Sequence, residues 1–390
     1  MTIRGAATEY DRLARICSRE YPEPRRGVFL NAASWGILPR VAATEVAELT
    51  MRRNLMDGFQ EAEAGAIQHR CRSVLAELLG TSVNEIALAP NTSFGVNLAA
   101  ALLRSGPPGT IVLSEGEFPA NVLPFKALTS VGFTVRIIPA TEAGTPDEPA
   151  LIEALGEDVV ALAVSSVQFA SGYLADMQRL GSACRDRGIY FFVDAIQSLG
   201  VAPFNPREVG ADIVAGGGQK WLCAPWGSGF TWIRSELQDR FDPPLVSWLA
   251  TARGADFDDM LHYSMEWRGN ARKFELATLG LQDYLGLAGS VEVLLEIGIE
   301  EIQRHVRTLQ APLFDWIGTR PDVRCPTPVD PERRAGIVAF APPDVSGVAR
   351  ALGEQGVVFS VREGLIRLAP HFYNTSDEIS RVVDVLETSA

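Results

Sequence analysis

One lysine lies between three glycines and an apolar, tryptophan-containing run in the stretch GGGQKWLCAPWG, which spans residues 216–227. A solvated lysine does not require such neighbours. An amine that is held away from water can form a Schiff base with a carbonyl group, and glycines let a ligand approach the backbone closely. The stretch therefore makes Lys220 a candidate for covalent chemistry.

The residues before this stretch alternate between short apolar runs, loops and helical patterns, as in EIALAPNTSFGVNLAAALL, VVALAVSSVQFASG and IYFFVDAIQ. This alternation of predicted strands and helices predicts a mostly parallel, doubly wound sheet. Ligands gather at the carboxyl ends of the strands in such sheets. The candidate residues that follow an apolar run are Thr92, Phe118, Ser166, Asp194 and Lys220.

The pattern changes after about Pro244. A long helical region over residues 277–317 predicts two helices, and the runs GIVAFAPP, VVFSVREG and LIRLAPHFYN predict strands. We therefore expect an α/β protein with a large domain over residues 27–250. A smaller α+β domain is expected from residues 1–26 and 251–390.

The composition indicates which binding partners and which cellular compartment to expect. The 390 residues carry a formal net charge of −13, which argues against nucleic acid or an anionic membrane as the main partner. The five cysteines are far apart and form no CxxC pair, so neither a metal site nor a disulfide framework is expected. No signal peptide and no membrane-spanning segment is recognised. These features predict a cytoplasmic protein.

A pyridoxal cofactor on Lys220 would need further groups, and the sequence offers a candidate for each. Asp194, at the end of the run IYFFV, is a carboxylate for the ring nitrogen, and Gln197 could reach the phenolic oxygen. Thr92 and Ser93 enter a predicted helix and suit the phosphate.

Two more candidates would serve the cofactor ring and the substrate. Phe118, in SEGEFPAN, suits the face of the ring. Arg367, in LIRLAPHFYNT, could hold a substrate carboxylate in a two-pronged contact.

Each of these residues also has a purely structural interpretation. An aspartate or a Thr-Ser pair before a helix is more often a cap, and a phenylalanine after a strand is usually part of the core. Arg367 alone is more often in an ion pair. The order of the residues and their shared placement at strand ends favour the functional interpretation.

Taken together, FFVDAIQSLGV and AGGGQKWLCAPWGSGF resemble the class V aminotransferase family of pyridoxal 5'-phosphate (PLP) enzymes. This group includes cysteine desulfurases, selenocysteine lyases, isopenicillin-N-epimerase-like proteins and kynureninases. The resemblance runs from about residue 29 to 375. It implies PLP-dependent transferase fold type I, with a mostly parallel seven-stranded sheet in the large domain and a smaller α+β C-terminal domain.

The resemblance also implies roles for individual residues. Lys220 matches the Schiff-base lysine, and Arg367 matches the arginine that binds the substrate carboxylate. The expected cofactor-binding residues are Thr92, Ser93, Phe118, Ser166, Asp194, Gln197, Gln219, Lys220 and Thr278. The loop with Asn31, Ala32 and Ala33 matches the substrate side. Thr278, in FELATLG, matches a segment that reaches the cofactor phosphate of a second subunit, so a homodimer with shared active sites is expected.

Several positions depart from the desulfurase pattern. Gly217 and Gln219 replace a serine and a histidine before the lysine, and Phe118 replaces a histidine that carries protons. The region GVVFSVREGLIR is short and contains no cysteine, which disfavours a desulfurase that forms a persulfide on the protein.

The sequence does not select among several reactions at the α or β carbon of an α-amino acid. A lyase of the β-elimination, C–S type is slightly favoured over an aminotransferase, an epimerase or a kynureninase-like cleavage. A degenerate PLP-fold regulator or scaffold would often have lost Lys220, Asp194 or Arg367. A lysine-dependent aldolase without PLP leaves the pairing of Asp194 with Gln197 unexplained.

Overall fold

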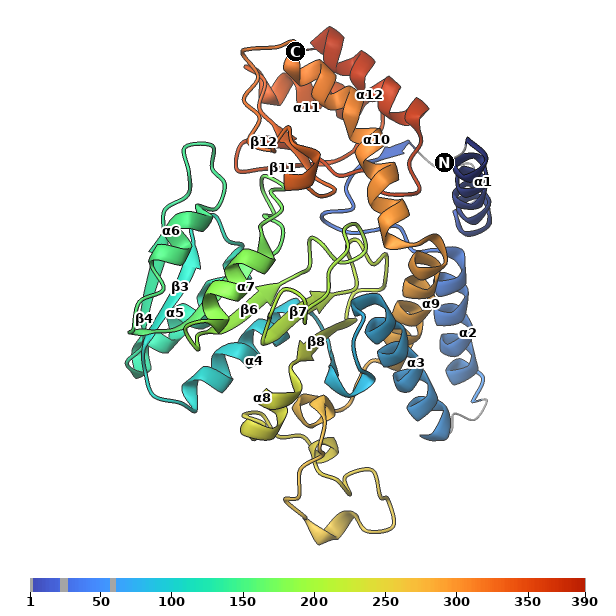
Figure 1. Cartoon of the computed structure of the whole chain (residues 1–390). Helices are drawn as coiled ribbons and strands as arrows, with labels where there is room; N and C mark the ends of the chain where they lie inside the picture. Colours follow the sequence, from blue (N-terminus) through green and yellow to red (C-terminus); the bar gives the residue numbers. More distant parts are fainter. Residues whose placement is uncertain (1–2, 22–26, 57–60, 390) are drawn as a thin grey trace.

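The structure of the protein is a computed structural model that describes residues 3–21, 27–56 and 61–389. A seven-stranded sheet lies at its centre (Figure 1). The strands are β2 (Ile86–Ala89), β3 (Thr110–Ser114), β4 (Thr134–Ile138), β5 (Val159–Ser165), β6 (Tyr190–Asp194), β7 (Ile213–Gly217) and β8 (Gly229–Ile233). Their order is β2-β8-β7-β6-β5-β3-β4. Only β8 runs antiparallel to its neighbours, so the prediction of a mostly parallel sheet is confirmed.

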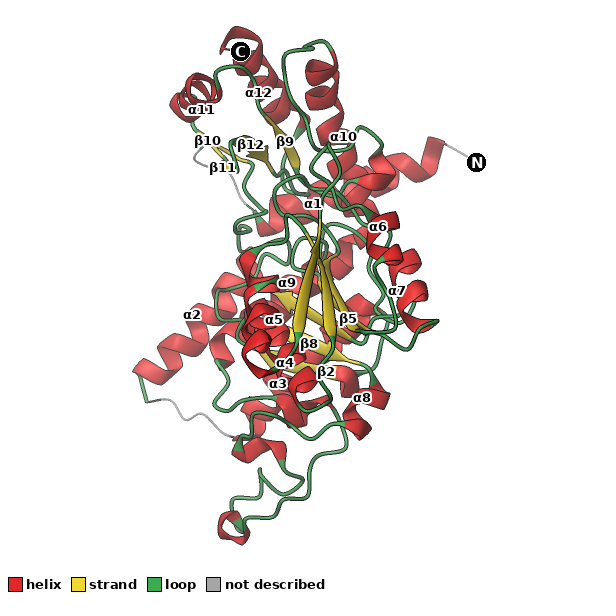
Figure 2. Cartoon of the chain, turned by 90° about the vertical axis from the view of Figure 1, so that its left-hand side faces the viewer, coloured by secondary structure: helices red, strands yellow, loops and turns green. Residues whose placement is uncertain are grey.

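Helices cover both faces of this twisted sheet (Figure 2). Successive side chains of a strand point to opposite faces, and in β6 Phe191 and Val193 enter one hydrophobic cluster while Phe192 enters the other. On the Phe192 face lie α4 (Thr92–Arg104), α5 (Leu123–Ala127) and α8 (Ser235–Arg240). On the Phe191 face lie α6 (Glu148–Glu153) and α7 (Met177–Arg185).

A group of long helices packs beside the sheet and leads to the C-terminal part. These helices are α1 (Ile3–Glu20), α2 (Arg40–Asn54), α3 (Glu61–Leu79), α9 (Leu281–Ile297) and α10 (Ile299–Gly318). Helix α9 packs against both α2 and α3. Gly298 separates α9 from α10 at a φ of 96°, a backbone angle that glycine adopts without strain. The prediction of two helices in this region is confirmed.

The C-terminal part forms a smaller α+β unit above the sheet (Figure 1). Its strands are β9 (Val338–Phe340), β10 (Val357–Val358), β11 (Ser360–Arg362) and β12 (Leu365–Leu368), and its further helices are α11 (Val345–Glu354) and α12 (Ser376–Ser389). Strands β11, β12 and β9 form an antiparallel sheet. Strand β1 (Val28–Phe29) pairs in parallel with β10, so the N-terminal region joins this unit. The division of domains near residues 27 and 250 stays a prediction.

Seven short 3₁₀ helices complete the described elements. They are Val83–Glu85, Pro119–Asn121, Leu128–Val131, Trp248–Ala250, Met260–His262, Ala271–Phe274 and Pro331–Arg333. No helix in the described ranges is both long enough and apolar enough to cross a membrane.

The chain between α8 and α9 extends away from the sheet, at the bottom of Figures 1 and 2. We call residues 241–270 the projecting arm. Its exposed large apolar side chains are Leu245, Val246, Trp248, Phe257, Met260, Leu261, Tyr263 and Met265. A monomeric surface rarely gathers so many apolar side chains, so the arm is a candidate contact surface.

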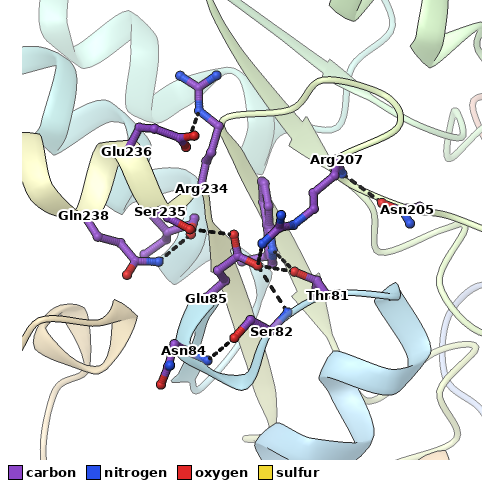
Figure 3. Close-up of polar contacts among 12 residues, drawn as sticks. Thr81, Ser82, Asn84, Glu85, Asn205, Arg207, Arg234, Ser235, Glu236 and Gln238 are labelled. Carbon is purple, nitrogen blue, oxygen red and sulfur yellow. Dashed lines mark hydrogen bonds and ion pairs between the residues drawn. The ribbon is translucent and has the colours of Figure 1, made fainter.

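A polar cluster stabilises the start of β2, at the opposite end of that strand from Thr92 (Figure 3). The buried carboxylate of Glu85 accepts hydrogen bonds from the Thr81 hydroxyl, from the Ser235 hydroxyl at 3.0 Å and from the Arg207 guanidinium at 2.8 Å. The Trp232 indole donates to the Thr81 oxygen at 2.9 Å. These contacts join β2 to the β8–α8 connection.

Candidate active site

The carboxyl ends of five strands meet at one edge of the sheet, as the sequence predicts. The residues carried there are Thr92 after β2, Phe118 after β3, Ser166 after β5, Asp194 at the end of β6 and Lys220 after β7. Parallel strands place their carboxyl ends side by side. Residues far apart in the sequence therefore become neighbours.

The amine of Lys220 lies over an aromatic ring in this site. Its Nζ is 5.8 Å from the centroid of the Phe118 ring. Burial lowers the pKa of Lys220 from 10.5 to about 8, while the charge of Asp194 acts in the opposite direction. At pH 7 about a tenth of the amine is therefore neutral and nucleophilic, far more than for a lysine with the ordinary pKa.

Asp194 is a buried carboxylate that interacts electrostatically with Lys220. Its Oδ1 accepts a hydrogen bond from the backbone N–H of Ile196 at 2.9 Å. Burial raises the pKa of Asp194 from 3.8 to about 6. A cationic group placed against this carboxylate would favour its ionised form.

The loop after β1 packs directly on the lysine loop. The backbone N–H of Gly36 donates to the Gln219 carbonyl at 2.8 Å, and a Cβ on Gly36 would lie 2.3 Å from the Lys220 carbonyl oxygen. Only glycine permits this approach.

The same loop contains the three residues predicted for the substrate side. Ala32 and Ala33 are fully buried, and the Ala33 carbonyl accepts from Gln197 Nε2 at 3.1 Å. The Asn31 Oδ1 atom is buried and has no hydrogen-bond partner among the described residues. A buried polar atom of this kind usually has a partner, so a bound ligand is a candidate for that role.

Thr92, Gly217 and Gln219 lie close together where α4 begins and β7 ends, and we call this group the cofactor cup. The Thr92 Oγ1 atom is buried and unpartnered within the described ranges. A Cβ on Gly217 would lie 2.8 Å from both Thr92 Oγ1 and Gln219 Oε1, so only glycine permits these polar atoms to lie so close to the backbone. Asn91 caps α4, and Ser93 is exposed in its first turn.

The cup has the donor set that a phosphate group requires. A helix N-terminus presents unpaired backbone N–H groups and the positive end of its dipole. The hydroxyl of Thr92 and the side chain of Gln219 flank this end of α4. The residues present therefore fit the phosphate of PLP.

A second aromatic side chain, which the sequence analysis missed, joins Phe118. The rings of Phe118 and Phe169 meet edge to face with centroids 5.2 Å apart. Phe169 follows β5 in a loop without a recognisable pattern. Its neighbour Gln168 is buried.

The buried carboxylate of Glu117 was also missed. Its Oε1 accepts from the backbone N–H of Ser165 and from Gln168 Nε2, each at 2.8 Å. Its Oε2 accepts from the Ser165 hydroxyl at 2.5 Å and from Asn121 Nδ2 at 2.9 Å. Four donors occupy both oxygens, so Glu117 joins the segment that carries Phe118 to the segment that carries Phe169. The only signal in the sequence is an acidic residue between a strand and Phe118-Pro119.

Arg367 is buried without a carboxylate partner in the described part of the chain. Its guanidinium donates to the Ser360 hydroxyl at 3.0 Å, the Phe169 carbonyl at 2.7 Å and the Ser34 hydroxyl at 2.8 Å. Burial lowers the pKa of Arg367 from 12.5 to about 10. A buried cation held only by neutral groups suits a carboxylate ligand.

Two further predicted residues are Ser166 and Thr278. The backbone N–H and the hydroxyl of Ser166 donate to the Asp194 carbonyl at 2.9 Å and 3.3 Å, and the hydroxyl lies 2.7 Å from the Ser198 hydroxyl. Thr278 is exposed, and its expected role concerns a second chain. The cofactor contacts of both residues stay predictions.

No group of three or more His, Cys, Asp or Glu side chains in the described ranges could hold a metal ion.

Comparisons with known proteins agree over nearly the whole chain. The family model described as aminotransferase class-V matches residues 28–382. A probable cysteine desulfurase of Methanothermobacter thermautotrophicus is 27% identical over 395 residues, covering 95% of this chain and 97% of the relative. An isopenicillin N epimerase of Streptomyces clavuligerus is 28% identical over 377 residues, covering 92% and 94%.

The fold is shared with a solved structure. The cystine C-S lyase C-DES, in complex with its product cysteine persulfide, matches with a TM-score of 0.82 and 23% identity, over 92% of this chain and 96% of that chain. The expected fold class and the family resemblance are both confirmed.

Proposed function

The chain belongs to the class V aminotransferase family of PLP-dependent enzymes, and from this premise we propose that it is a β-elimination lyase. Its substrate would be an α-amino acid with a sulfur-containing leaving group on the β carbon. The observation that carries the proposal is the buried Lys220 amine, with its lowered pKa, beside Asp194. The buried guanidinium of Arg367, which has no carboxylate partner among the described residues, lies in the same site.

The residues of the site divide between cofactor and substrate. Lys220 would hold PLP covalently through its amine, Asp194 would contact the ring nitrogen, and Gln197 would contact the phenolic oxygen. Phe118 would cover the ring together with Phe169. The proposed phosphate and ring contacts are completed by Thr92, Ser93, Ser166, Gln219 and, from the second subunit, Thr278.

Arg367 would bind the α-carboxylate of the substrate through two parallel hydrogen bonds. Ser34, Phe169 and Ser360 already orient its guanidinium. The loop with Asn31, Ala32 and Ala33 would close the substrate side, where the unpartnered Asn31 Oδ1 can accept from the substrate.

PLP, when bound, stabilises negative charge that develops at the substrate α carbon. With cofactor and substrate bound, the free amine of Lys220 would take the α proton as a general base. A group with a pKa of about 8 is suited to both accept and return a proton near neutral pH. Arg367 would bind the substrate carboxylate and so limit the orientations that the α carbon can take relative to the amine of Lys220.

Three features favour elimination over the other outcomes. Relatives with similar length are named as cysteine desulfurases, and C-DES is named as a C-S lyase. Phe118 and Phe169 carry no ionisable group, so neither ring can supply the second proton carrier that inversion at the α carbon requires. The hairpin from β11 to β12 contains no cysteine, so sulfur would leave in a small product.

A homodimer is part of the proposal. The exposed apolar side chains of the projecting arm would be covered by a second copy of the chain. The exposed Thr278 follows the arm and would reach the site of the second copy. The described residues contain no disulfide bond, which supports a reducing, cytoplasmic location.

The proposal is tested by an absorption spectrum of the protein with PLP, followed by borohydride reduction and peptide mapping. The sequence contains only three lysines, Lys126, Lys220 and Lys273, so the reduced cofactor is expected on Lys220 and absent in Lys220→Ala. Exposed Lys126, changed to alanine, is the matched control.

Product analysis then identifies the reaction. With cystine or cysteine, a lyase releases ammonia, a keto acid and a sulfur product in equal amounts. Keto acid formation that consumes an acceptor keto acid would instead show an aminotransferase. Exchange of the α proton with inversion would show an epimerase, and cleavage beyond the β carbon would show a kynureninase-like reaction.

A further inference from the structure

The side-chain amide of Gln197 has one defined orientation. Its Oε1 accepts a hydrogen bond from Trp221 Nε1 at 2.7 Å, and its Nε2 donates to the Ala33 carbonyl at 3.1 Å. An indole N–H only donates and a carbonyl only accepts, so the two ends of the amide cannot be exchanged. One N–H of Gln197 is left for another partner.

Trp221 is itself held in place by its packing. The side chain is fully buried, and a Cβ on Gly336 would lie 2.2 Å from its Cη2. The ring therefore fills a niche that only glycine leaves open at residue 336. The indole N–H cannot move away from Gln197 without displacing this packing.

A buried histidine holds the backbone of Trp221. His371 Nε2 lies 2.8 Å from the Trp221 carbonyl, and His371 Nδ1 accepts from the Phe372 N–H at 2.8 Å. Since Nδ1 is an acceptor, the proton is on Nε2. Burial lowers the pKa of His371 to about 4, so the ring is neutral and this donor is present at working pH.

We propose that Trp221 is a positioning residue that keeps an N–H of Gln197 directed at the phenolic oxygen of the cofactor. This inference rests on the proposed function, in which Gln197 contacts that oxygen. If the indole N–H is removed, the side-chain amide of Gln197 can flip and direct its oxygen at the phenolic oxygen. Two acceptors would then face each other. The tryptophan next to the lysine therefore acts on the cofactor through Gln197 and does not touch the reacting atoms.

Trp221→Phe tests the proposal because it removes the indole N–H and keeps an aromatic ring. A donor to the phenolic oxygen stabilises its anionic, deprotonated form. Loss of that donor should therefore raise the pH midpoint of the visible absorption change by about one pH unit, and weaken PLP binding about tenfold. Both are measured on the protein with bound PLP, without turnover.

Trp232→Phe is the matched control. Trp232 is also fully buried, and its indole N–H also donates to one side-chain oxygen, that of Thr81 in the Glu85 cluster (Figure 3). This cluster lies at the other end of β2 from the cofactor cup. Trp232→Phe should lower stability but leave the pH midpoint unchanged.

Two further variants keep the test decisive. In Gln197→Ala, adding Trp221→Phe should cause no additional shift. Gln197→Glu can still accept from the indole but presents an acceptor in place of the N–H, so its midpoint should rise by at least as much as that of Trp221→Phe. This second variant tests the inference even if Trp221→Phe does not fold.

The outcomes separate the inference from the proposed function. A visible band in the wild-type protein with an unchanged midpoint in Trp221→Phe or in Gln197→Glu overturns the inference alone. An equal shift in the Gln197→Ala background also overturns it. The complete absence of a band in the wild-type protein with excess PLP overturns both.

Discussion

The amine of Lys220 is subject to two opposing influences. Burial removes water from around the ammonium group and favours the neutral amine, whereas the carboxylate of Asp194 favours the ammonium form. Burial dominates, and the pKa falls to about 8. Because the cofactor reacts only with the neutral amine, this balance controls how the protein captures PLP.

The rate at which the apo protein captures PLP should therefore rise with pH and level off above about 8. Below that pH the protonated amine is not a nucleophile. In Asp194→Asn the attraction that stabilises the ammonium is lost, so the midpoint should move to lower pH. Rapid-mixing absorbance measurements across pH would give both midpoints.

Asp186→Asn, which removes an exposed carboxylate after α7, should leave the midpoint unchanged. A wild-type midpoint near 10.5, the ordinary pKa of lysine, would contradict the prediction.

At the scale of elements, Glu117 joins the segments that follow β3 and β5. The two strands pair in the sheet, but their backbone hydrogen bonds stop where the strands end. It follows β3, whereas the donors Ser165 and Gln168 lie at and after β5. The contact with Asn121 also fixes the short helix after Phe118. One carboxylate thus connects the two segments that carry the aromatic rings of the site.

Glu117→Gln should lower the free energy of unfolding by about 2–3 kcal/mol, because an amide N–H₂ replaces one oxygen that accepts two hydrogen bonds. Two of the groups that now donate to a Glu117 oxygen would then face an N–H₂ group, which is also a donor, in a buried environment. Denaturant unfolding of the apo protein measures this loss.

Glu115→Gln is the matched control, since Glu115 is exposed two residues earlier and accepts one backbone hydrogen bond from Ala140 at 2.8 Å. It should lower stability by less than half as much. Equal losses in the two variants would show that Glu117 does not hold the site together.

At the scale of the whole molecule, the exposed apolar side chains of the projecting arm are the basis of the proposed homodimer. Leu261 is 79% exposed, Tyr263 is 78% exposed and Met265 is 65% exposed. Burial of such side chains against a second copy would remove apolar surface from water. The arm leads directly to the segment with Thr278.

The double variant Leu261→Asp, Met265→Glu should shift the protein from dimer to monomer in sedimentation velocity, because charges would have to be buried at the contact. PLP should also dissociate more readily, since each site is expected to use a residue of the second chain. Val329→Asp changes a side chain that is 74% exposed outside the arm and should have neither effect. A wild-type protein that sediments as a monomer would contradict the prediction.

The sequence by itself determined the α/β class, the position of Lys220 and its order relative to Asp194, Gln197 and Thr92. These follow from local patterns, since apolar runs of strand length and helix caps depend on residues close together in the chain. Parallel topology then brings the strand ends together.

Only the tertiary structure decided the contacts that support these residues. The sequence does not indicate that Glu117 meets Gln168, that Trp221 orients Gln197, or that β1 pairs with β10. Each contact joins segments that are separate in the chain, and buried polar groups can be satisfied in many alternative ways. The physical reason is that periodicity reports which face of an element is buried, whereas the choice among polar partners is made only when all elements pack together.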